Sequence, residues 1–239
     1  MLKTAILIAC GSFSPITYAH LRMFEMAKDV LNDLGYTVEK GYLSPVSDSY
    51  KKKGLAQAKH RIVMIELAIA TSPWLQCSTW EAEQEGFTPT AQVLRYISDS
   101  HNRSHSSKAQ VFFVAGSDLV KTFLDEKSWA REDIRQLTEM YQTIVIQRKM
   151  DVEDVKDAGK DVVFPFPTIA VKQEIVNEIS STKLREFIAK EKSIRYLTDD
   201  HVVNYILRNN LYKPSITTSS VTTTTTGTSA MPSSTLASR

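Results

Sequence analysis

The fold is decided by residues 4–20, TAILIACGSFSPITYAH. The opening apolar run is too short for a membrane span and lacks the cleavage site of a signal peptide, so we interpret it as a buried strand. Gly11 then permits a sharp turn or the close approach of a ligand, Pro15 stiffens the loop, and Thr17 is a candidate N-cap. His20 would follow in the first turn of an amphipathic helix, where unpaired N–H groups and the helix dipole attract anions.

Strands and helices alternate along the rest of the chain. Apolar or β-branched runs predict strands at 5–9, 38–43, 111–115 and 143–147, and helical periodicity predicts helices at 21–34, 60–70, 91–98, 119–123, 132–140, 183–190 and 199–208. Such alternation is typical of parallel strands joined by right-handed crossovers. We therefore expect an α/β fold with a single Rossmann-like, doubly wound parallel sheet and helices on both faces. Ligands would bind beyond the carboxyl ends of its strands.

Composition limits the classes of function. The 239 residues include 29 basic and 27 acidic side chains, a net charge of +2, so no overall basic field indicates a nucleic-acid partner. The eight glycines form neither G-x-G-x-x-G nor a Walker A loop, so a nucleotide would be bound in another way. Cys10 and Cys77 fit neither a zinc site nor a disulfide framework and favour a reducing compartment. With no stretch resembling a membrane span, we expect a soluble, intracellular protein of the cytoplasm or the nucleus.

The C-terminal end has a different composition. Residues 214–239 contain nine Thr and seven Ser and no acidic residue. Such a segment cannot bury enough apolar surface to offset the entropy of ordering it. We therefore expect a folded domain at 1–212 and a disordered Ser/Thr-rich tail at 213–239.

The histidines outside the first loop suggest no metal site. Residues 101–108, HNRSHSSK, predict an exposed loop between a helix and a strand. His101 and His105 have i,i+4 spacing, but their polar surroundings favour two solvent-exposed side chains over metal ligands. His60 and His201 are interpreted as residues on helix surfaces.

Two further stretches contain groups suited to a phosphate. Residues 44–55, SPVSDSYKKKGL, place a lysine run in a loop after a predicted strand, and 179–185, ISSTKLR, place Ser180 or Ser181 at a helix N-terminus with Arg185 close behind. Taken alone, the lysine run fits a solvated surface or a nuclear-targeting signal equally well, and the second stretch fits an ordinary capped helix.

Together with GSFSPITYAH at 11–20, these stretches resemble the eukaryotic nicotinamide/nicotinate mononucleotide adenylyltransferases of the nucleotidylyltransferase superfamily. The G-x-F-x-P-x-[TH]-x-x-H, SPV-x-D-x-YKKKGL and ISSTK-x-R signatures occur in order, and the resemblance extends over 4–212. It implies that 1–212 is a catalytic domain. It also implies transfer of the adenylyl group of ATP to nicotinamide mononucleotide, and to nicotinate mononucleotide, with Mg²⁺ carried by ATP. The products would be NAD or deamido-NAD and pyrophosphate, and a homo-oligomer stays open.

The resemblance also implies roles for individual residues. The catalytic residues would be His20, Lys52 and Arg185. ATP would contact Gly11, Ser12, Phe13, His20, Gly116, Asp118, Ser180, Ser181, Thr182 and Arg185, and the mononucleotide would contact Ser12, Lys52, Phe87, Thr90, Asp118 and Trp129. Phe87 stands where the family has a Trp, Gln142 where it has a glycine, and residues 125–128 replace a Pro-Gly type of loop. Trp80 is expected in the core, and no dedicated metal site is expected.

The expected chemistry needs no general base. A phosphate monoester has a second pKa near 6 and is largely dianionic at neutral pH, so alignment and charge neutralisation are what the protein must supply. One alternative is another nucleotidylyltransferase of the superfamily, acting on pantetheine phosphate or flavin mononucleotide. The other is a catalytically silent nucleotide-binding or chaperone-like protein with the same fold.

Overall fold

The computed structural model describes residues 3–50, 52–104, 108–124, 129–147 and 168–214. The predicted tail, apart from its first two residues, lies outside the described residues, as do His105 and the loop 125–128. The elements in chain order are β1 (Lys3–Gly11), α1 (Tyr18–Asp33), β2 (Tyr36–Pro45), α2 (Ala58–Ile69), β3 (Leu75–Cys77), the 3-10 helix η1 (Glu81–Glu83), α3 (Thr90–Arg103), β4 (Gln110–Gly116), α4 (Ser117–Lys121), the 3-10 helix η2 (Thr122–Leu124), α5 (Arg131–Met140), β5 (Gln142–Gln147), β6 (Thr168–Lys172), α7 (Ser181–Ala189) and α8 (Asp200–Arg208).

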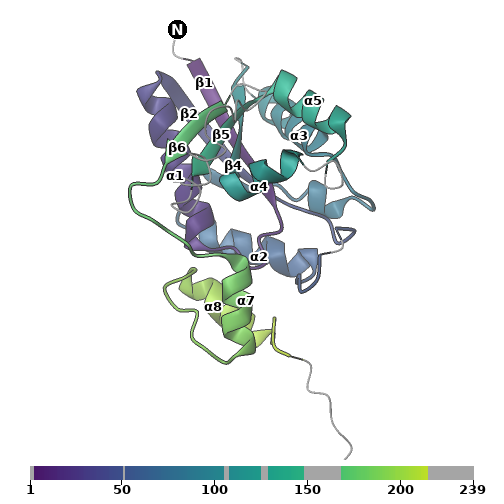
Figure 1. Cartoon of the computed structure of the whole chain (residues 1–239), viewed down its shortest axis with the longest axis vertical. Helices are drawn as coiled ribbons and strands as arrows, with labels where there is room; N and C mark the ends of the chain where they lie inside the picture. Colours follow the sequence, from purple (N-terminus) through teal and green to yellow (C-terminus); the bar gives the residue numbers. More distant parts are fainter. Residues whose placement is uncertain (1–2, 51, 105–107, 125–128, 148–167, 215–239) are drawn as a thin grey trace, which may run out of the picture.

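The strands form one six-stranded parallel sheet in the order β3-β2-β1-β4-β5-β6 (Figure 1). The chain moves from β1 outward to β2 and β3, and then returns to the other side of β1 to add β4, β5 and β6. The loops that follow β1 and β4 therefore leave the sheet in opposite directions, which opens a crevice at their carboxyl ends. The predicted Rossmann-like, doubly wound fold is confirmed.

Two strands at the sheet edges were not predicted. β3 has only three residues, which is too short for an alternating pattern to show. β6 alternates weakly, because only Val171 of its five residues is buried. Edge strands need little apolar content, since one side of the ladder is unpaired, so the sequence pattern gives them little signal.

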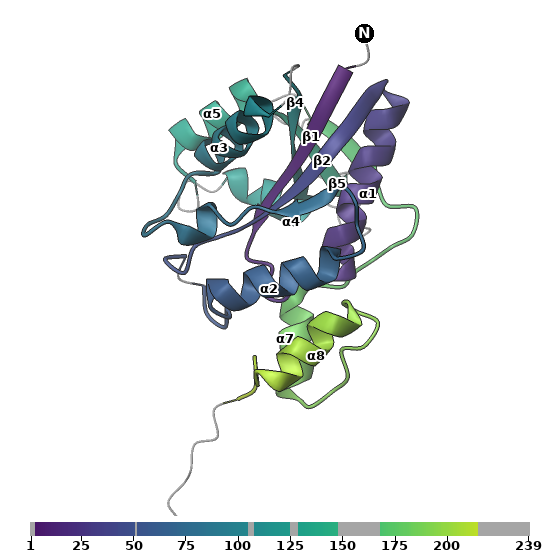
Figure 2. The ribbon, with the colours of Figure 1, turned by 180° about the vertical axis from the view of Figure 1, so that it is seen from behind.

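Two apolar clusters cover the two faces of the sheet. Ala5, Leu7 and Ala9 of β1 point into the cluster that includes residues of α1, α2, α7 and α8, whereas Ile6 and Ile8 point into the cluster built with α3, α4 and α5. Figures 1 and 2 show α1 and the pair α3 and α5 on opposite faces, with α7 and α8 beyond the carboxyl end of the sheet. The central part of β1, residues 5–9, is apolar at every position, as a sheet buried on both faces requires.

The prediction for residues 101–108 was wrong at its start. α3 continues to Arg103, and His101 is buried, with 3% of its surface exposed. Its Nε2 lies 2.8 Å from the Glu39 carboxylate, and its Nδ1 lies 3.0 Å from the Tyr42 hydroxyl. These partners on β2 satisfy a polar ring in the core, so His101 is a structural residue and not a solvent-exposed one.

Gly41 lies in β2 and faces side chains of the first apolar cluster. A Cβ at this position would lie 2.7 Å from Leu75 Cδ2 and 2.8 Å from both Phe24 Cδ1 and Trp74 Cζ3. The glycine therefore allows the Trp74 ring, which is buried, to pack directly on the strand backbone.

Candidate functional site

A cavity of about 460 Å³ lies at the carboxyl ends of β1 and β4. Its walls come from the loops after β1, β2 and β4, the loop before α3 and the N-terminal turn of α7. The sequence-predicted site residues that line it are Gly11, Ser12, Phe13, His20, Lys52, Phe87, Thr90, Gly116, Asp118, Trp129, Ser180, Ser181, Thr182 and Arg185. The fold thus brings every predicted site residue to one cavity, although they are spread over most of the domain sequence.

The first loop, residues 12–17 between β1 and α1, presents His20 in a defined orientation. Thr17 is the N-cap of α1, as predicted, and His20 is the third helical residue. The Thr17 backbone N–H donates to His20 Nδ1 over 3.0 Å, so the proton of the neutral ring lies on Nε2. The Phe13 ring meets the imidazole edge-on at 5.3 Å between centroids. Nε2 is therefore the hydrogen-bond donor that His20 can offer to an anion.

Most of the carbonyl groups of this loop are held by side chains from distant elements. Ser14 O accepts from Arg185 Nη1 over 2.8 Å, Pro15 O accepts from the Ser181 hydroxyl over 2.8 Å, and Ile16 O accepts from the Thr198 hydroxyl over 2.7 Å. In a peptide unit the N–H points opposite to the C=O, so fixing the carbonyls also fixes the direction of the N–H groups. The C-terminal segment therefore determines the shape of the first loop.

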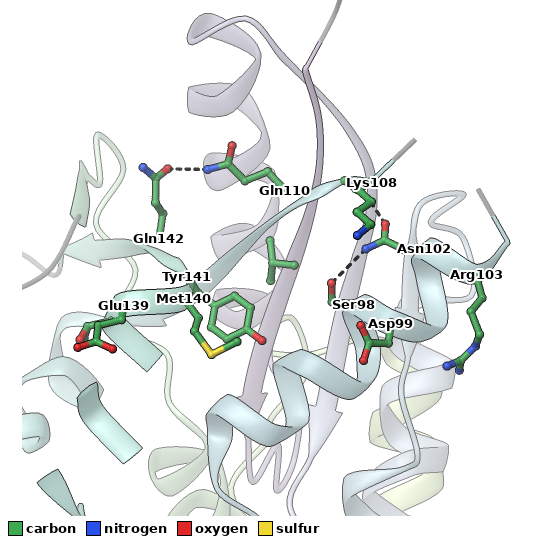
Figure 3. Close-up of a pocket in the computed structure, with 13 residues that line it drawn as sticks. Ser98, Asp99, Asn102, Arg103, Lys108, Gln110, Glu139, Met140, Tyr141 and Gln142 are labelled. Atoms are coloured by element: carbon green, nitrogen blue, oxygen red, sulfur yellow. Dashed lines mark hydrogen bonds between the residues drawn. The ribbon is translucent and has the colours of Figure 1, made fainter. Parts of the chain in front are cut away.

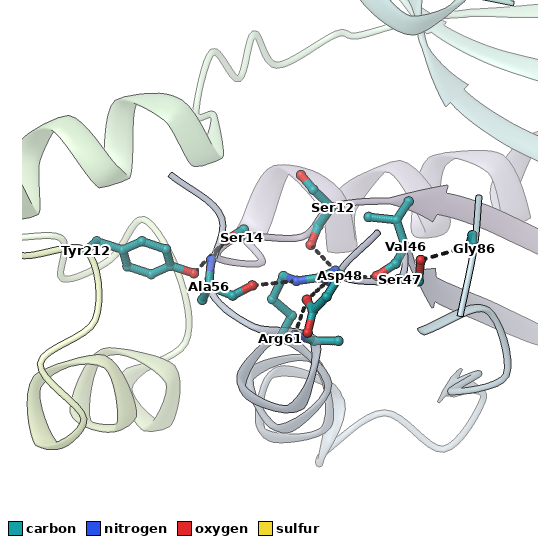
Figure 4. Close-up of polar contacts among 10 residues, drawn as sticks. Ser12, Ser14, Val46, Ser47, Asp48, Ala56, Arg61, Gly86 and Tyr212 are labelled. Carbon is teal, nitrogen blue, oxygen red and sulfur yellow. Dashed lines mark hydrogen bonds and ion pairs between the residues drawn. The ribbon is translucent and has the colours of Figure 1, made fainter. Parts of the chain in front are cut away.

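Arg61 joins the first loop to the second loop, which follows β2 and begins at Val46. Arg61 received no role in the sequence analysis. Its side chain is fully buried. It donates to Ser12 O over 3.2 Å and to Val46 O over 2.7 Å, and lies 3.1 Å from Asp48 Oδ1 (Figure 4). Asp48 Oδ1 also accepts the Ala58 N–H at the start of α2. The available signal was an arginine on the apolar face of a predicted helix, which is typical of a buried structural cation.

The start of α7 shows which of the two serines, Ser180 or Ser181, caps the helix. Ser180 is the N-cap, and its hydroxyl accepts from Lys183 N over 3.3 Å. Arg185 lies on the next turn and donates to the Thr182 hydroxyl over 3.2 Å as well as to the first loop. The helix N-terminus, the Thr182 hydroxyl and the guanidinium consequently face one part of the cavity, an arrangement suited to an anion of several charges.

At the end of β4, Gly116 is the N-cap of α4 and Asp118 lies in the first turn. A Cβ on Gly116 would lie 2.6 Å from Asp118 Oδ1. A side chain at residue 116 would therefore displace the carboxylate from the cavity wall.

The two aromatic side chains that the resemblance assigns to the mononucleotide both line the cavity. Phe87 is 64% exposed, and Trp129 is half-buried, with its Nε1–H donating to the Thr122 hydroxyl over 2.9 Å. The backbone beside Phe87 is tied to the second loop, because the Ser47 and Ser49 hydroxyls donate to Gly86 O and Glu85 O over 3.0 and 2.6 Å. Trp80 does not line the cavity. It stacks on Tyr96 and packs against the core, as predicted.

Glu81 is a cavity-lining carboxyl group to which the sequence gave no role. It is buried, and it accepts from the Ser44 hydroxyl over 2.6 Å. Burial raises its pKa from 4.5 to about 7, an effect only partly opposed by Ser44 and by the charge of Arg61. Burial also raises the pKa of the neighbouring Cys10 thiol well above its usual range. Cys10 therefore remains a thiol at neutral pH and is a poor nucleophile.

A larger, more open groove of about 880 Å³ lies at the opposite end of the sheet (Figure 3). It is lined by the ends of α3 and α5 and the starts of β4 and β5, including Asp99, Arg103, Lys108 and Glu139. Parallel α/β sheets bind their ligands at the carboxyl ends of the strands, so we assign the site to the smaller cavity.

The described part of the chain contains no cluster of three or more His, Cys, Asp or Glu side chains that could hold a metal ion. Within the same residues, none of the helices has the length and apolar content needed to cross a membrane. His60 and His201 both lie on helices, His60 half-buried with Nδ1 2.9 Å from the Tyr205 hydroxyl and His201 exposed.

Comparisons with known proteins identify the family of this chain. A family model described as cytidylyltransferase-like matches residues 8–187. A nicotinamide/nicotinic acid mononucleotide adenylyltransferase of Oryza sativa subsp. japonica is 42% identical over 214 residues, which cover 87% of this chain and 86% of the relative. Enzyme 1 of that name from Bos taurus is 36% identical over 87% of this chain and 88% of its own length.

Two further comparisons differ in how much of each protein they cover or in how similar they are. Enzyme 2 of the same name from Saccharomyces cerevisiae is 39% identical over 87% of this chain, which spans 56% of that longer relative. A solved structure from Vibrio parahaemolyticus superposes with a TM-score of 0.51 at 17% identity, over 86% of this chain and 99% of that one, and supports the fold alone. The chain therefore belongs to the cytidylyltransferase-like family and, within it, to the nicotinamide/nicotinic acid mononucleotide adenylyltransferases.

Proposed function

We propose that this protein transfers the adenylyl group of ATP to nicotinamide mononucleotide and to nicotinate mononucleotide, forming NAD or deamido-NAD and pyrophosphate. Family membership supports this activity. The observation that best supports the site is the common cavity lined by residues of all three sequence signatures, from Gly11 to Arg185.

The reaction makes modest demands on the protein. The phosphate of the mononucleotide attacks the α-phosphorus of ATP, the new P–O bond forms, and the bond to pyrophosphate breaks. The attacking phosphate is already largely dianionic at neutral pH, so no side chain needs to remove a proton. Catalysis then consists of aligning the two phosphates and neutralising the charge that develops between them.

The ATP side of the cavity supplies hydrogen-bond donors and one fixed cation. His20 Nε2–H would donate to the α-phosphate, beside the backbone of Gly11, Ser12 and Phe13. The β- and γ-phosphates would meet Arg185, Thr182 and the N–H groups at the start of α7, with Ser180 as cap. The Ser181 hydroxyl already donates to Pro15 O, so Ser181 would contact ATP through its backbone N–H. Gly116 and Asp118 would contact the adenosine.

The mononucleotide side combines a cation with flat apolar surfaces. Lys52 is exposed at the cavity mouth and would neutralise the mononucleotide phosphate, next to Ser12 and Asp118. Phe87 and Trp129 would contact the nicotinamide ring, for which face-on aromatic contact is favourable because the ring is planar and cationic. Thr90, the first residue of α3, also lines the cavity and would contact the mononucleotide.

Mg²⁺ would enter with the substrate as MgATP. The triphosphate and water would hold the ion, in line with the preference of Mg²⁺ for water and substrate oxygens over a cage of protein ligands. We further propose a cytoplasmic or nuclear enzyme, because Cys10 and Cys77 are both free thiols, a state favoured in a reducing compartment.

A coupled assay of NAD formation tests the proposal. The purified chain is incubated with MgATP and either mononucleotide, and pyrophosphate release is measured in parallel. We expect both products with both substrates. Pyrophosphate release only with pantetheine phosphate or flavin mononucleotide would favour another nucleotidylyltransferase. ATP binding without pyrophosphate release from any of the substrates would favour a catalytically silent protein.

A further inference from the structure

Ser14 is the junction between the first loop and the C-terminal segment. Its side chain is fully buried, and its Oγ accepts the Ala56 N–H over 3.0 Å. The same Oγ lies 2.8 Å from the Tyr212 hydroxyl, and the Ser14 carbonyl accepts from Arg185 Nη1. Figure 4 shows the Tyr212 ring directed at Ser14 from the C-terminal segment. Arg185 lines the cavity, whereas Ser14 and Tyr212 lie behind it.

The end of α8 is built to deliver Tyr212 to this place. After Arg208 the chain closes with a Schellman motif, in which Leu211 N donates to Ile206 O and Asn210 N donates to Leu207 O. Asn210 has the positive φ of 50° that this motif requires, and asparagine tolerates it well. The chain then turns back, so that Tyr212, 198 residues away in sequence, meets Ser14.

The loop needs such support because its conformation is not one that the chain adopts unaided. Phe13, directly before Ser14, has a φ of 44°, in the left-handed region that non-glycine residues rarely occupy. A residue in this region persists only when its surroundings hold it there. Burial also raises the pKa of Tyr212 to about 12, so the hydroxyl keeps its proton at any pH at which the enzyme would work.

We infer that Tyr212 is a positioning residue for the triphosphate: its hydroxyl fixes Ser14, and the Ser14 carbonyl in turn fixes the Arg185 guanidinium on the cavity wall. This inference rests on the proposed function, because it takes the anion near Arg185 to be the triphosphate of ATP. Tyr212 itself touches no substrate. Its loss should therefore weaken ATP binding and leave the mononucleotide side unchanged.

The test compares Tyr212→Phe, Ser14→Ala and the double variant with the unmodified chain. For Tyr212→Phe we expect KM for ATP to rise about five- to tenfold, the loss expected for one buried hydrogen bond, with kcat and KM for the mononucleotide within about twofold. The dissociation constant of ATP, measured by calorimetry without mononucleotide, should rise by the same factor. If Tyr212 acts through Ser14, the double variant should match Ser14→Ala to within about twofold.

Tyr205→Phe is the matched control. It removes a hydroxyl from helix α8, the element directly before Tyr212. Tyr205 Oη lies 2.9 Å from His60 Nδ1 on α2, a contact that does not involve the first loop. We expect it to lower the melting temperature much as Tyr212→Phe does and to leave KM for ATP unchanged.

Three results would overturn the inference: an unchanged KM for ATP in Tyr212→Phe, an equal rise in Tyr205→Phe, or independent, multiplicative effects in the double variant. If Tyr212→Phe does not fold, Ser14→Ala tests the same contact from the other side, and an unchanged KM for ATP in that variant overturns it. Failure of the proposed function is a separate result, because it would appear as absence of NAD formation by the unmodified chain.

Discussion

The backbone N–H of Thr17 donates to Nδ1 of His20 over 3.0 Å, and the Thr17 hydroxyl lies 2.8 Å from the same nitrogen. Proton placement in a histidine is decided by the hydrogen bond that the other nitrogen makes. At the first turn of α1 this contact selects, in the neutral ring, the tautomer that carries its proton on Nε2.

His20→Ala should remove this donor and leave the fold intact. We expect kcat for NAD formation to fall about 10²- to 10³-fold, the loss typical of one donor to transition-state charge. The exposed His201→Ala on α8 serves as the control and should keep full activity. Circular dichroism should show both variants folded. A kcat close to that of the unmodified chain in a folded His20→Ala would contradict the assigned role.

Glu81→Gln should change how stability depends on pH. The pKa of Glu81 is about 7 in the folded protein against an ordinary 4.5, so between these values the folded state binds more protons than the unfolded chain. The contribution of this proton uptake to the free energy of unfolding is fully present below pH 4.5. It is lost as pH rises through 7, and the loss amounts to about 3 kcal/mol at most.

Urea unfolding of the Glu81→Gln variant between pH 5 and 8 should therefore show a flatter loss of unfolding free energy than the unmodified chain shows. Glu83→Gln, an exposed change in the same turn, should keep the original slope. The same slope in Glu81→Gln as in the unmodified chain would argue against a raised pKa.

Gly41→Ala should destabilise the protein without changing its chemistry. The new methyl group would overlap the Leu75, Phe24 and Trp74 side chains, none of which lines the cavity. Overpacking of this kind costs about 1–3 kcal/mol, so the melting temperature should fall while KM values stay constant. At Gly86, where no atom lies within 4 Å of an added Cβ, the same substitution should leave the melting temperature unchanged.

Phe87→Trp should strengthen mononucleotide binding. Trp is the better partner for a cationic ring, and the position is 64% exposed, so the larger side chain has room. We expect KM for nicotinamide mononucleotide to fall about two- to fivefold with KM for ATP unchanged. Tyr196→Trp, at an 81% exposed position outside the cavity, should alter neither value. A raised KM for the mononucleotide in Phe87→Trp would show that Phe87 does not face the ring.

The family resemblance identified the polar residues of the cavity wall, because they occur in contiguous motifs that can be recognised in the sequence alone. It could not place residues such as Arg61, Glu81 and Tyr212, because their partners lie far away in the chain and no local spacing records them. His101 was misjudged for the same reason: a polar stretch of sequence hides a side chain whose partners, Glu39 and Tyr42, are on another element. The two edge strands, β3 and β6, were not predicted because a short or half-exposed strand shows little periodicity in its sequence.

The first loop depends on contacts with Ser181, Arg185 and Thr198, and this dependence affects how the protein folds during its synthesis. A ribosome releases the N-terminal end first, so β1 and its loop exist long before the side chains that hold the loop's carbonyls. The strands can pair as they emerge, but the cavity at their carboxyl ends is completed only when nearly the last residues of the domain have been made. A chain interrupted before α7 would thus contain all six strands of the sheet and lack the side chains that shape this cavity.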